Sequence, residues 1–174
     1  MAVEVAAAPS RAELGREHQP VLLPPITGGG PLGLLLLLMI VLTNPRLLPF
    51  LSQVMGADPH VRYVYDKTDG WYLVDLTTGT EYKSLRDRGE ASDYGYVGRL
   101  PRPDGKGTFL YLAGTHAQGT LGAAHYVTTN LGELYRELKA RRFSTVIECR
   151  YDPSDPRTVV STERVTPLYR HEGS

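Results

Sequence analysis

Residues 109–127, FLYLAGTHAQGTLGAAHYV, hold a polar turn between a predicted strand and a predicted helix. The turn combines short polar side chains with glycines, whose backbone a ligand can approach closely. Amide groups at a helix amino terminus attract anions, and ligands of open α/β sheets gather where strands lead into such helices. The turn therefore predicts a site for a phosphate or carboxylate, built by Gly114, Thr115, His116, Gln118, Gly119 and Thr120.

Asp93 and Arg99, in the stretch SDYGYVGRL, are the other candidates for this site. Asp93 comes just before a predicted strand and could turn toward the same sheet edge, and Arg99 could pair with the anion. The alternative is an Asp-initiated turn and a solvent-facing arginine. The letters GTHAQGT match neither the Walker A pattern nor the dinucleotide fingerprint, and Gly with Thr before a helix is also ordinary capping chemistry.

His116 is the candidate catalytic residue, because an imidazole can exchange a proton near neutral pH. A lone histidine in a loop is otherwise solvated or bonded to backbone. Cys149 is the single cysteine of the chain, which excludes an internal disulfide and a cysteine-rich zinc site. It lies on an apolar strand face, which favours a buried small hydrophobe over a nucleophile. The sequence predicts no metal site and no cofactor.

The elements that position these residues lie in residues 61–170, which predict a soluble α/β domain. Alternating aromatic and β-branched runs, VRYVYD, GWYLVDL and TEYKS, predict a meander, with Gly79 in the hairpin loop before the last of them. DYGYVGRLPRP predicts a strand ended by prolines, and TFLYLAG is apolar on both faces, as in a central strand. FSTVIECRYD and TVVSTERVTPLYR predict the closing strands.

A helix follows the polar turn, because apolar residues recur there at three- and four-residue spacing. Asn130 and Glu133 resemble a capping pair, so a kink near Thr129 could divide this segment into two helices. The element order predicts an α/β fold, with α+β as the alternative. Its mixed sheet would hold a strand-helix-strand unit, with helices on one face or both.

The amino-terminal third contains an uninterrupted apolar run, LLLLLMIVL, inside a long stretch without charge. A spanning helix needs roughly 20 mostly apolar residues, so the apolar segment 19–55 predicts a single transmembrane helix over about residues 28–45. A buried core helix after the strand PVLLPPI and a cleaved signal peptide are the alternatives. Residues 1–18 are polar and Ala-rich and predict a mobile tail.

Charge constrains the location and partners of the chain. Three basic residues, Arg46, Arg62 and Lys67, soon follow the predicted helix, and Arg11 and Arg16 precede it, which favours a cell-membrane protein with its carboxy-terminal domain in the cytoplasm. Lys plus Arg and Asp plus Glu both number 19, so no net field attracts nucleic acid. The predicted partners are a small anionic ligand and a protein in the membrane or at its surface.

The pattern D-Y-G, followed by A-G-x-x-x-x-G-T-x-G-A-A, resembles an uncharacterised bacterial α/β domain found beside regulatory or membrane modules. The resemblance covers roughly residues 61–170. It depends on Asp93, Tyr94, Gly95, Gly114, Gly119, Thr120, Gly122, Ala123 and Ala124. It implies a sensing or accessory role by association, with no established activity.

These features predict a membrane-tethered bacterial sensor or accessory protein, more a binding protein than an enzyme. Its soluble domain would bind a small anionic ligand or a partner protein at residues 114–122. One alternative is a hydrolase or transferase directed at a phosphate or nucleotide, with His116 as general base. Another is a small structural subunit of a larger assembly.

Overall fold

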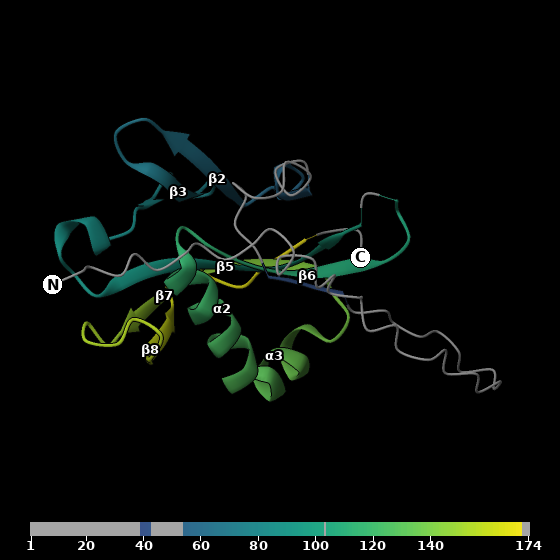
Figure 1. Cartoon of the computed structure of the whole chain (residues 1–174). Helices are drawn as coiled ribbons and strands as arrows, with labels where there is room; N and C mark the ends of the chain where they lie inside the picture. Colours follow the sequence, from purple (N-terminus) through teal and green to yellow (C-terminus); the bar gives the residue numbers. More distant parts are fainter. Residues whose placement is uncertain (1–38, 43–53, 103, 172–174) are drawn as a thin grey trace, which may run out of the picture. The chain divides into compact units, whose positions relative to one another are not determined.

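The computed structural model describes residues 39–42, 54–102 and 104–171, which all belong to a unit that begins at Leu36. Its main sheet has the strand order β1-β6-β5-β7-β8, and β9 also pairs with β7 (Figure 1). The strands of this sheet are β1 (Met39–Leu42), β5 (Ser92–Pro101), β6 (Thr108–Gly114), β7 (Phe143–Tyr151), β8 (Val159–Arg164) and β9 (Tyr169–Arg170). All pairs in it are antiparallel except β1 with β6.

A second, three-stranded antiparallel sheet contains the predicted meander. It consists of β2 (Val61–Asp66), β3 (Gly70–Asp75) and β4 (Glu81–Tyr82), in that order. Gly79 has a φ of 74° in the turn between β3 and β4, so the predicted use of glycine at this hairpin is confirmed. A short 3-10 helix, η1 (Arg86–Arg88), leads from this sheet to β5.

Two helices, α2 (Ala117–Thr129) and α3 (Leu131–Leu138), connect β6 to β7. The predicted division near Thr129 is confirmed, but the Asn130–Glu133 capping pair is not formed. The Asn130 side-chain amide instead donates to the carbonyl of Tyr126 at 2.9 Å, and Asn130 makes no side-chain cap to α3. Asn130 therefore stabilises the end of α2.

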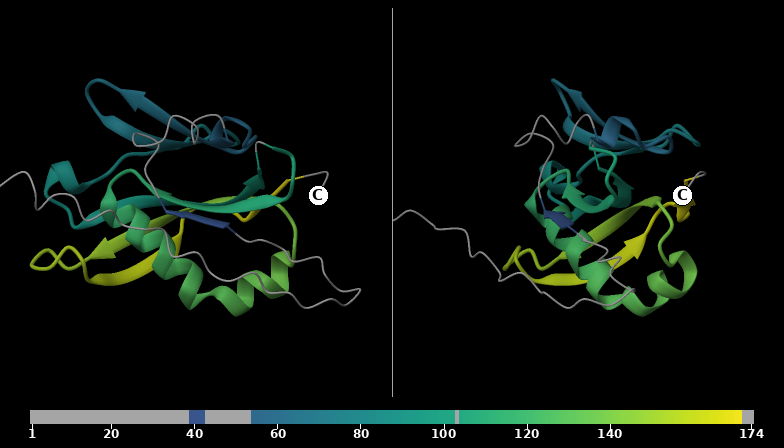
Figure 2. Two further views of the ribbon diagram at one scale, coloured as in Figure 1. Left: turned by 45° about the vertical axis from the view of Figure 1, so that its right-hand side comes forward. Right: turned by 90° about the vertical axis from the view of Figure 1, so that its right-hand side faces the viewer.

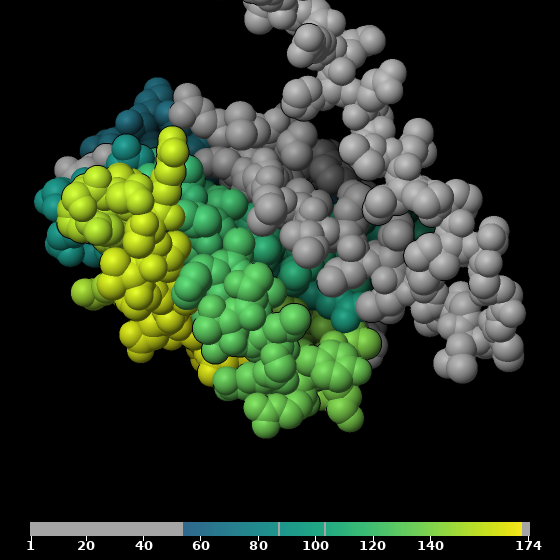
Figure 3. Space-filling model, turned by 60° about the horizontal axis from the view of Figure 1, so that its bottom comes forward, coloured from purple at the N-terminus to yellow at the C-terminus, as the bar shows by residue number. Residues whose placement is uncertain are grey.

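The main sheet separates two cores (Figure 2). The helices cover one of its faces and the three-stranded sheet lies over the other. The first core includes Val97, Leu112, Ala123, Tyr126, Leu134, Ile147 and Cys149. The second includes Met55, Val61, Leu73, Tyr96, Leu100, Tyr111 and Val146. In the space-filling view α2 and α3 lie on the surface, with the carboxy-terminal strands beside α2 (Figure 3).

The predicted α/β class is wrong, because the sheets are mainly antiparallel. β6, the two helices and β7 form the predicted strand-helix-strand unit, but β5 lies between β6 and β7 and pairs antiparallel with both. The helices α2 and α3 cover one face, and the other face packs on the three-stranded sheet and on the helical turn at 54–56. The predicted central strand, β6, lies beside β5, which is the middle strand of the order. Local apolar patterns do not show which strand occupies the centre.

The predicted transmembrane helix is also wrong. Met39–Leu42, inside the predicted span, form β1 and pair in parallel with Phe109–Leu112 of β6. Within the described part of the chain, every helix is too short or too polar to cross a membrane. The single-pass and cell-membrane assignments rested on that helix and fall with it. A short continuous apolar run is compatible with a strand as well as with a helix. Residues 1–38 and 43–53, which include the amino-terminal tail and most of the apolar segment, lie outside the described residues.

Candidate functional site

The structure brings Asp93 to the predicted turn, where its carboxylate bonds to the protein's own donors. One oxygen, Oδ2, accepts from the backbone amides of His116 at 3.1 Å and Gly119 at 2.7 Å. The other, Oδ1, accepts from the hydroxyl of Thr115 and lies 3.6 Å from Nδ1 of His116. Asp93 thus occupies the place that the sequence analysis assigned to an anionic ligand.

Asp93 is fully buried and remains ionised there. Burial by itself would raise its pKa, but the bonds from His116, Thr115 and the Gly119 amide outweigh burial and hold the pKa below the usual range. A second anion at the turn would be repelled by this negative charge. The turn therefore has a structural explanation that needs no ligand.

The glycines of the motif allow α2 to lie close to the main sheet. A Cβ at Gly119 would lie 2.1 Å from the carbonyl oxygen of Tyr94, and a Cβ at Gly122 would lie 2.3 Å from the Cβ of Cys149. A Cβ at Gly95 of β5, in the same contact, would lie 2.4 Å from the carbonyl oxygen of Gly119. Since real side chains do not tolerate such distances, these positions require glycine for packing.

Of the other predicted residues, Gly114 and Thr120 pack in the same turn, whereas Arg99 lies apart from this carboxylate. Arg99 follows Asp93 by six residues along β5, which is roughly 20 Å of extended chain. Its guanidinium donates to the Thr108 hydroxyl at 2.7 Å. Gln118 accepts from Arg86 at 3.5 Å, and Gly114 and Thr120 lie at the end of β6 and in the first turn of α2. Asp93 and Arg99 do not face one common ligand.

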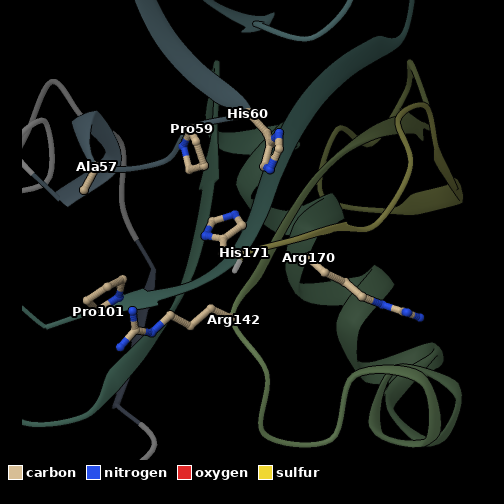
Figure 4. Close-up of a pocket in the computed structure, with 7 residues that line it drawn as sticks. All are labelled: Ala57, Pro59, His60, Pro101, Arg142, Arg170 and His171. Atoms are coloured by element: carbon tan, nitrogen blue, oxygen red, sulfur yellow. The ribbon is translucent and has the colours of Figure 1, made fainter. Parts of the chain in front are cut away.

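A different cavity, of about 450 Å³, lies where β9 meets the start of β7 (Figure 4). Its lining residues are Ala57, Pro59, His60, Pro101, Arg142, Arg170 and His171, and we call it the basic pocket. Backbone pairing builds it, because β9 pairs with Phe143–Ser144 and the amide of His171 donates to the carbonyl of Arg142 at 3.1 Å. Residues 57–60, which directly precede β2, form another part of the wall.

Cationic and imidazole groups dominate the basic pocket. The rings of His60 and His171 lie 5.5 Å apart, and His60 stacks on Tyr169 at 4.6 Å. Figure 4 shows His171 between His60 and Arg142. The guanidinium of Arg170 points away from both rings, and it pairs with Glu137 at 3.4 Å. Arg142, His60 and His171 are therefore the groups that a ligand would meet.

A buried carboxylate, Asp58, supports this wall from behind. Its Oδ1 accepts from the amides of His60 at 2.8 Å and Val61 at 3.2 Å and from the Ser144 hydroxyl at 3.1 Å. Its Oδ2 accepts from the Tyr96 hydroxyl at 2.6 Å. These bonds tie the segment before β2 to β5 and β7, and they satisfy the carboxylate inside the protein.

Asp58, Ser144 and His171 do not form a nucleophilic triad. Both Ser144 Oγ, at 3.0 Å, and Asp58 Oδ1, at 3.4 Å, face the same ring nitrogen of His171, Nε2. In a triad the acid holds the nitrogen opposite the nucleophile. Ser144 is fully buried, and its hydroxyl donates a hydrogen bond to Asp58. The hydroxyl oxygen of Ser144 therefore accepts a hydrogen bond from His171. Burial lowers the pKa of His171, and although Asp58 opposes this, His60 and Arg142 lower it further.

Sequence reasoning missed the basic pocket because its residues come from four distant segments. Only the dipeptide Arg170–His171 places two of its basic side chains together in the chain. Among the residues that the structure describes, no three His, Cys, Asp or Glu side chains form a metal-binding group. Comparisons with protein-family models, curated proteins and solved structures found no match.

Proposed function

We propose that this chain is a ligand-binding accessory module that holds a small anion, such as a phosphate or carboxylate group, in the basic pocket. The observation that carries the proposal is the charge of the wall. Its described lining residues include two arginines and two histidines and no carboxylate. An anion there would meet the guanidinium of Arg142 and the ring edges of His60 and His171.

The nearest carboxylate, Asp58, does not compete with a ligand for Arg142, His60 and His171, because its oxygens are already bonded inside the protein. Asp58 is 1% exposed and already accepts bonds from four other residues. It orients His171 and fixes the segment that carries His60. Arg142 therefore gives the pocket a positive charge, while the negative charge of Asp58 stays inside the protein.

Binding is favoured over catalysis because the hydroxyl nearest the imidazole is inaccessible. Ser144 is fully buried, and its proton already bonds to Asp58. Nucleophilic catalysis needs a hydroxyl that a substrate can reach. The geometry supports recognition of an anion without a covalent step.

Inorganic sulfate tests the proposal, because its charge stays constant between pH 5 and pH 8. We expect sulfate to bind the full chain in isothermal titration calorimetry, and Arg142→Gln to weaken binding about 10-fold or more, since a charged hydrogen bond contributes about 1.5–3 kcal/mol. Arg141→Gln is the matched control, because the exposed neighbour does not line the pocket. Equal affinities in the two variants would refute the site.

The pH dependence gives a second test. The pKa of His171 is lowered in the free protein, so the ring is neutral at pH 7 and gains its charge only as the pH falls. An anion favours the charged ring. Sulfate affinity should therefore rise as the pH falls from 7.5 to 5.5, and His171→Gln should reduce this rise. A flat profile in the wild type would contradict the assignment of His171.

A further inference from the structure

A second concavity, of about 270 Å³, lies on the helix face of the main sheet. We call it the α3 groove. It is lined by α3, by the end of α2 and by the starts of β6 and β7, and it shares no lining residue with the basic pocket. Its surface is almost entirely apolar, with leucine, valine and aromatic side chains. The groove therefore suits a ligand with a large hydrocarbon part.

The rim of the α3 groove exposes apolar side chains that the fold does not cover. Leu131 is 60% exposed and Tyr135 is 70% exposed. They are four residues apart on α3, so they lie on the same helix face. Leu134 and Leu138 of the same helix are buried in the core. The rim residues thus extend the hydrophobic core outward along one side of the groove.

One end of the α3 groove carries a buried positive charge. Arg99 is only 8% exposed, and it donates to neutral oxygens, the Thr108 hydroxyl at 2.7 Å and the Lys139 carbonyl at 3.5 Å. Among the described residues, no carboxylate lies within ion-pair distance of its guanidinium. Buried charges in proteins are usually paired, because removing them from water is costly. Lys139 adds a second cation at this end.

We propose that the α3 groove binds an unbranched aliphatic carboxylate. The carboxylate accepts from Arg99 and lies near Lys139, and the alkyl chain lies along the apolar wall toward Leu131. Charge complementarity selects this occupant: an apolar cleft that ends in a guanidinium with no acidic partner among the described residues matches a hydrocarbon chain that ends in an acid. The proposal is independent of anion binding in the basic pocket.

The volume of the α3 groove indicates how long the alkyl chain of the ligand can be. If a methylene takes about the 30 Å³ that a water molecule occupies in the liquid, the groove holds roughly nine such groups. Decanoate therefore fits, and shorter acids leave part of the groove empty. Each methylene removed should weaken binding about four-fold, from the free energy of burying one methylene.

Calorimetry on the full chain tests the proposal with decanoate, octanoate, hexanoate and the neutral analogue decanol. We expect decanoate to bind about 10-fold or more tightly than decanol, and each two-carbon shortening to cost about 16-fold. Absence of decanoate binding, or equal affinity for decanoate and decanol, would overturn the proposal. Absence of binding is also the result if another part of the chain or a second copy fills the groove.

Two leucine variants locate the site without disturbing the core. Leu131→Glu places a negative charge at the groove rim, and Leu121→Glu places one on an exposed α2 leucine that does not line the groove. Only the first should weaken decanoate, by about 10-fold or more. Equal weakening in both variants would count against the groove. Arg99→Met should remove the preference for decanoate over decanol, and sulfate binding in this variant should stay unchanged.

Discussion

Replacing Gly119 with alanine should destabilise the protein, whereas the same replacement at Gly132 should stabilise it. A Cβ at Gly119 would lie 2.1 Å from the carbonyl oxygen of Tyr94, and no atom lies within 4 Å of a Cβ at Gly132. To restore an ordinary contact, α2 would have to move about 1 Å from β5. That movement would also stretch the 2.7 Å bond from the Gly119 amide to Asp93.

The magnitude follows from three effects at Gly119. Overpacking against backbone costs about 1–3 kcal/mol, and a weakened helix cap costs about 1 kcal/mol. Alanine gains back about 1 kcal/mol of helix propensity. The net loss at Gly119 is therefore about 1–3 kcal/mol, against a gain of about 0.5–1 kcal/mol at Gly132.

Urea unfolding followed by far-ultraviolet circular dichroism measures both variants against the wild type. The two midpoints should move in opposite directions. If Gly119→Ala is as stable as Gly132→Ala, the close approach of α2 to β5 does not exist in solution. The motif would then need another explanation, and a ligand at the turn would be the first to test.

Three further predictions concern single side chains. Asp93→Ala should lower the free energy of unfolding by about 2–4 kcal/mol, since a helix cap and buried donors lose their partner. Because the native pKa of Asp93 is lowered, the wild type should keep this advantage above the ordinary Asp pKa of about 3.9 and lose it as the pH falls further. Urea titrations of both proteins from pH 7 to pH 2 would show this. Lys139 has a φ of 50° and a ψ of −116°, a conformation that favours glycine. Lys139→Gly should therefore raise the free energy of unfolding by about 0.5–1 kcal/mol. If Lys139→Gly is no more stable than Lys139→Ala, the backbone at this position is not strained. Burial raises the pKa of the Cys149 thiol to about 11, so a thiol reagent at pH 8 should label it only after unfolding, and rapid labelling of the folded chain would disprove its burial.

Most strands and the helix pair could be predicted from local patterns. The alternation in residues 61–75 and 143–151 matches β2, β3 and β7, and the three- and four-residue spacing matches α2 and α3. The apolar run that contains Met39–Leu42 could not be interpreted in this way. Its length suited a spanning helix, and only pairing with β6 identifies Met39–Leu42 as a strand.

The candidate site at Asp93 shows a similar division. The sequence offered a position for Asp93 near the turn before α2 as one of two interpretations, and it left open whether the turn bound an external anion. Asp93 is 22 residues before Thr115, and only the alignment of β5 with β6 brings the two together. The basic pocket was beyond local reasoning altogether, because residues 57–60, 142 and 170–171 meet only when β9 pairs with β7.

The sequence by itself determined the positions of most strands and of the helix pair, the loop glycine at 79 and the apolar character of Cys149, because these depend on neighbours a few residues away. The tertiary structure alone decided the strand order, the occupant of the α2 amides and the charge of each cavity. Those properties depend on long-range backbone pairing, which decides whether a carboxylate such as Asp93 or Asp58 is satisfied inside the protein. The same pairing leaves the guanidinium of Arg99 without an acidic partner in the described part of the chain.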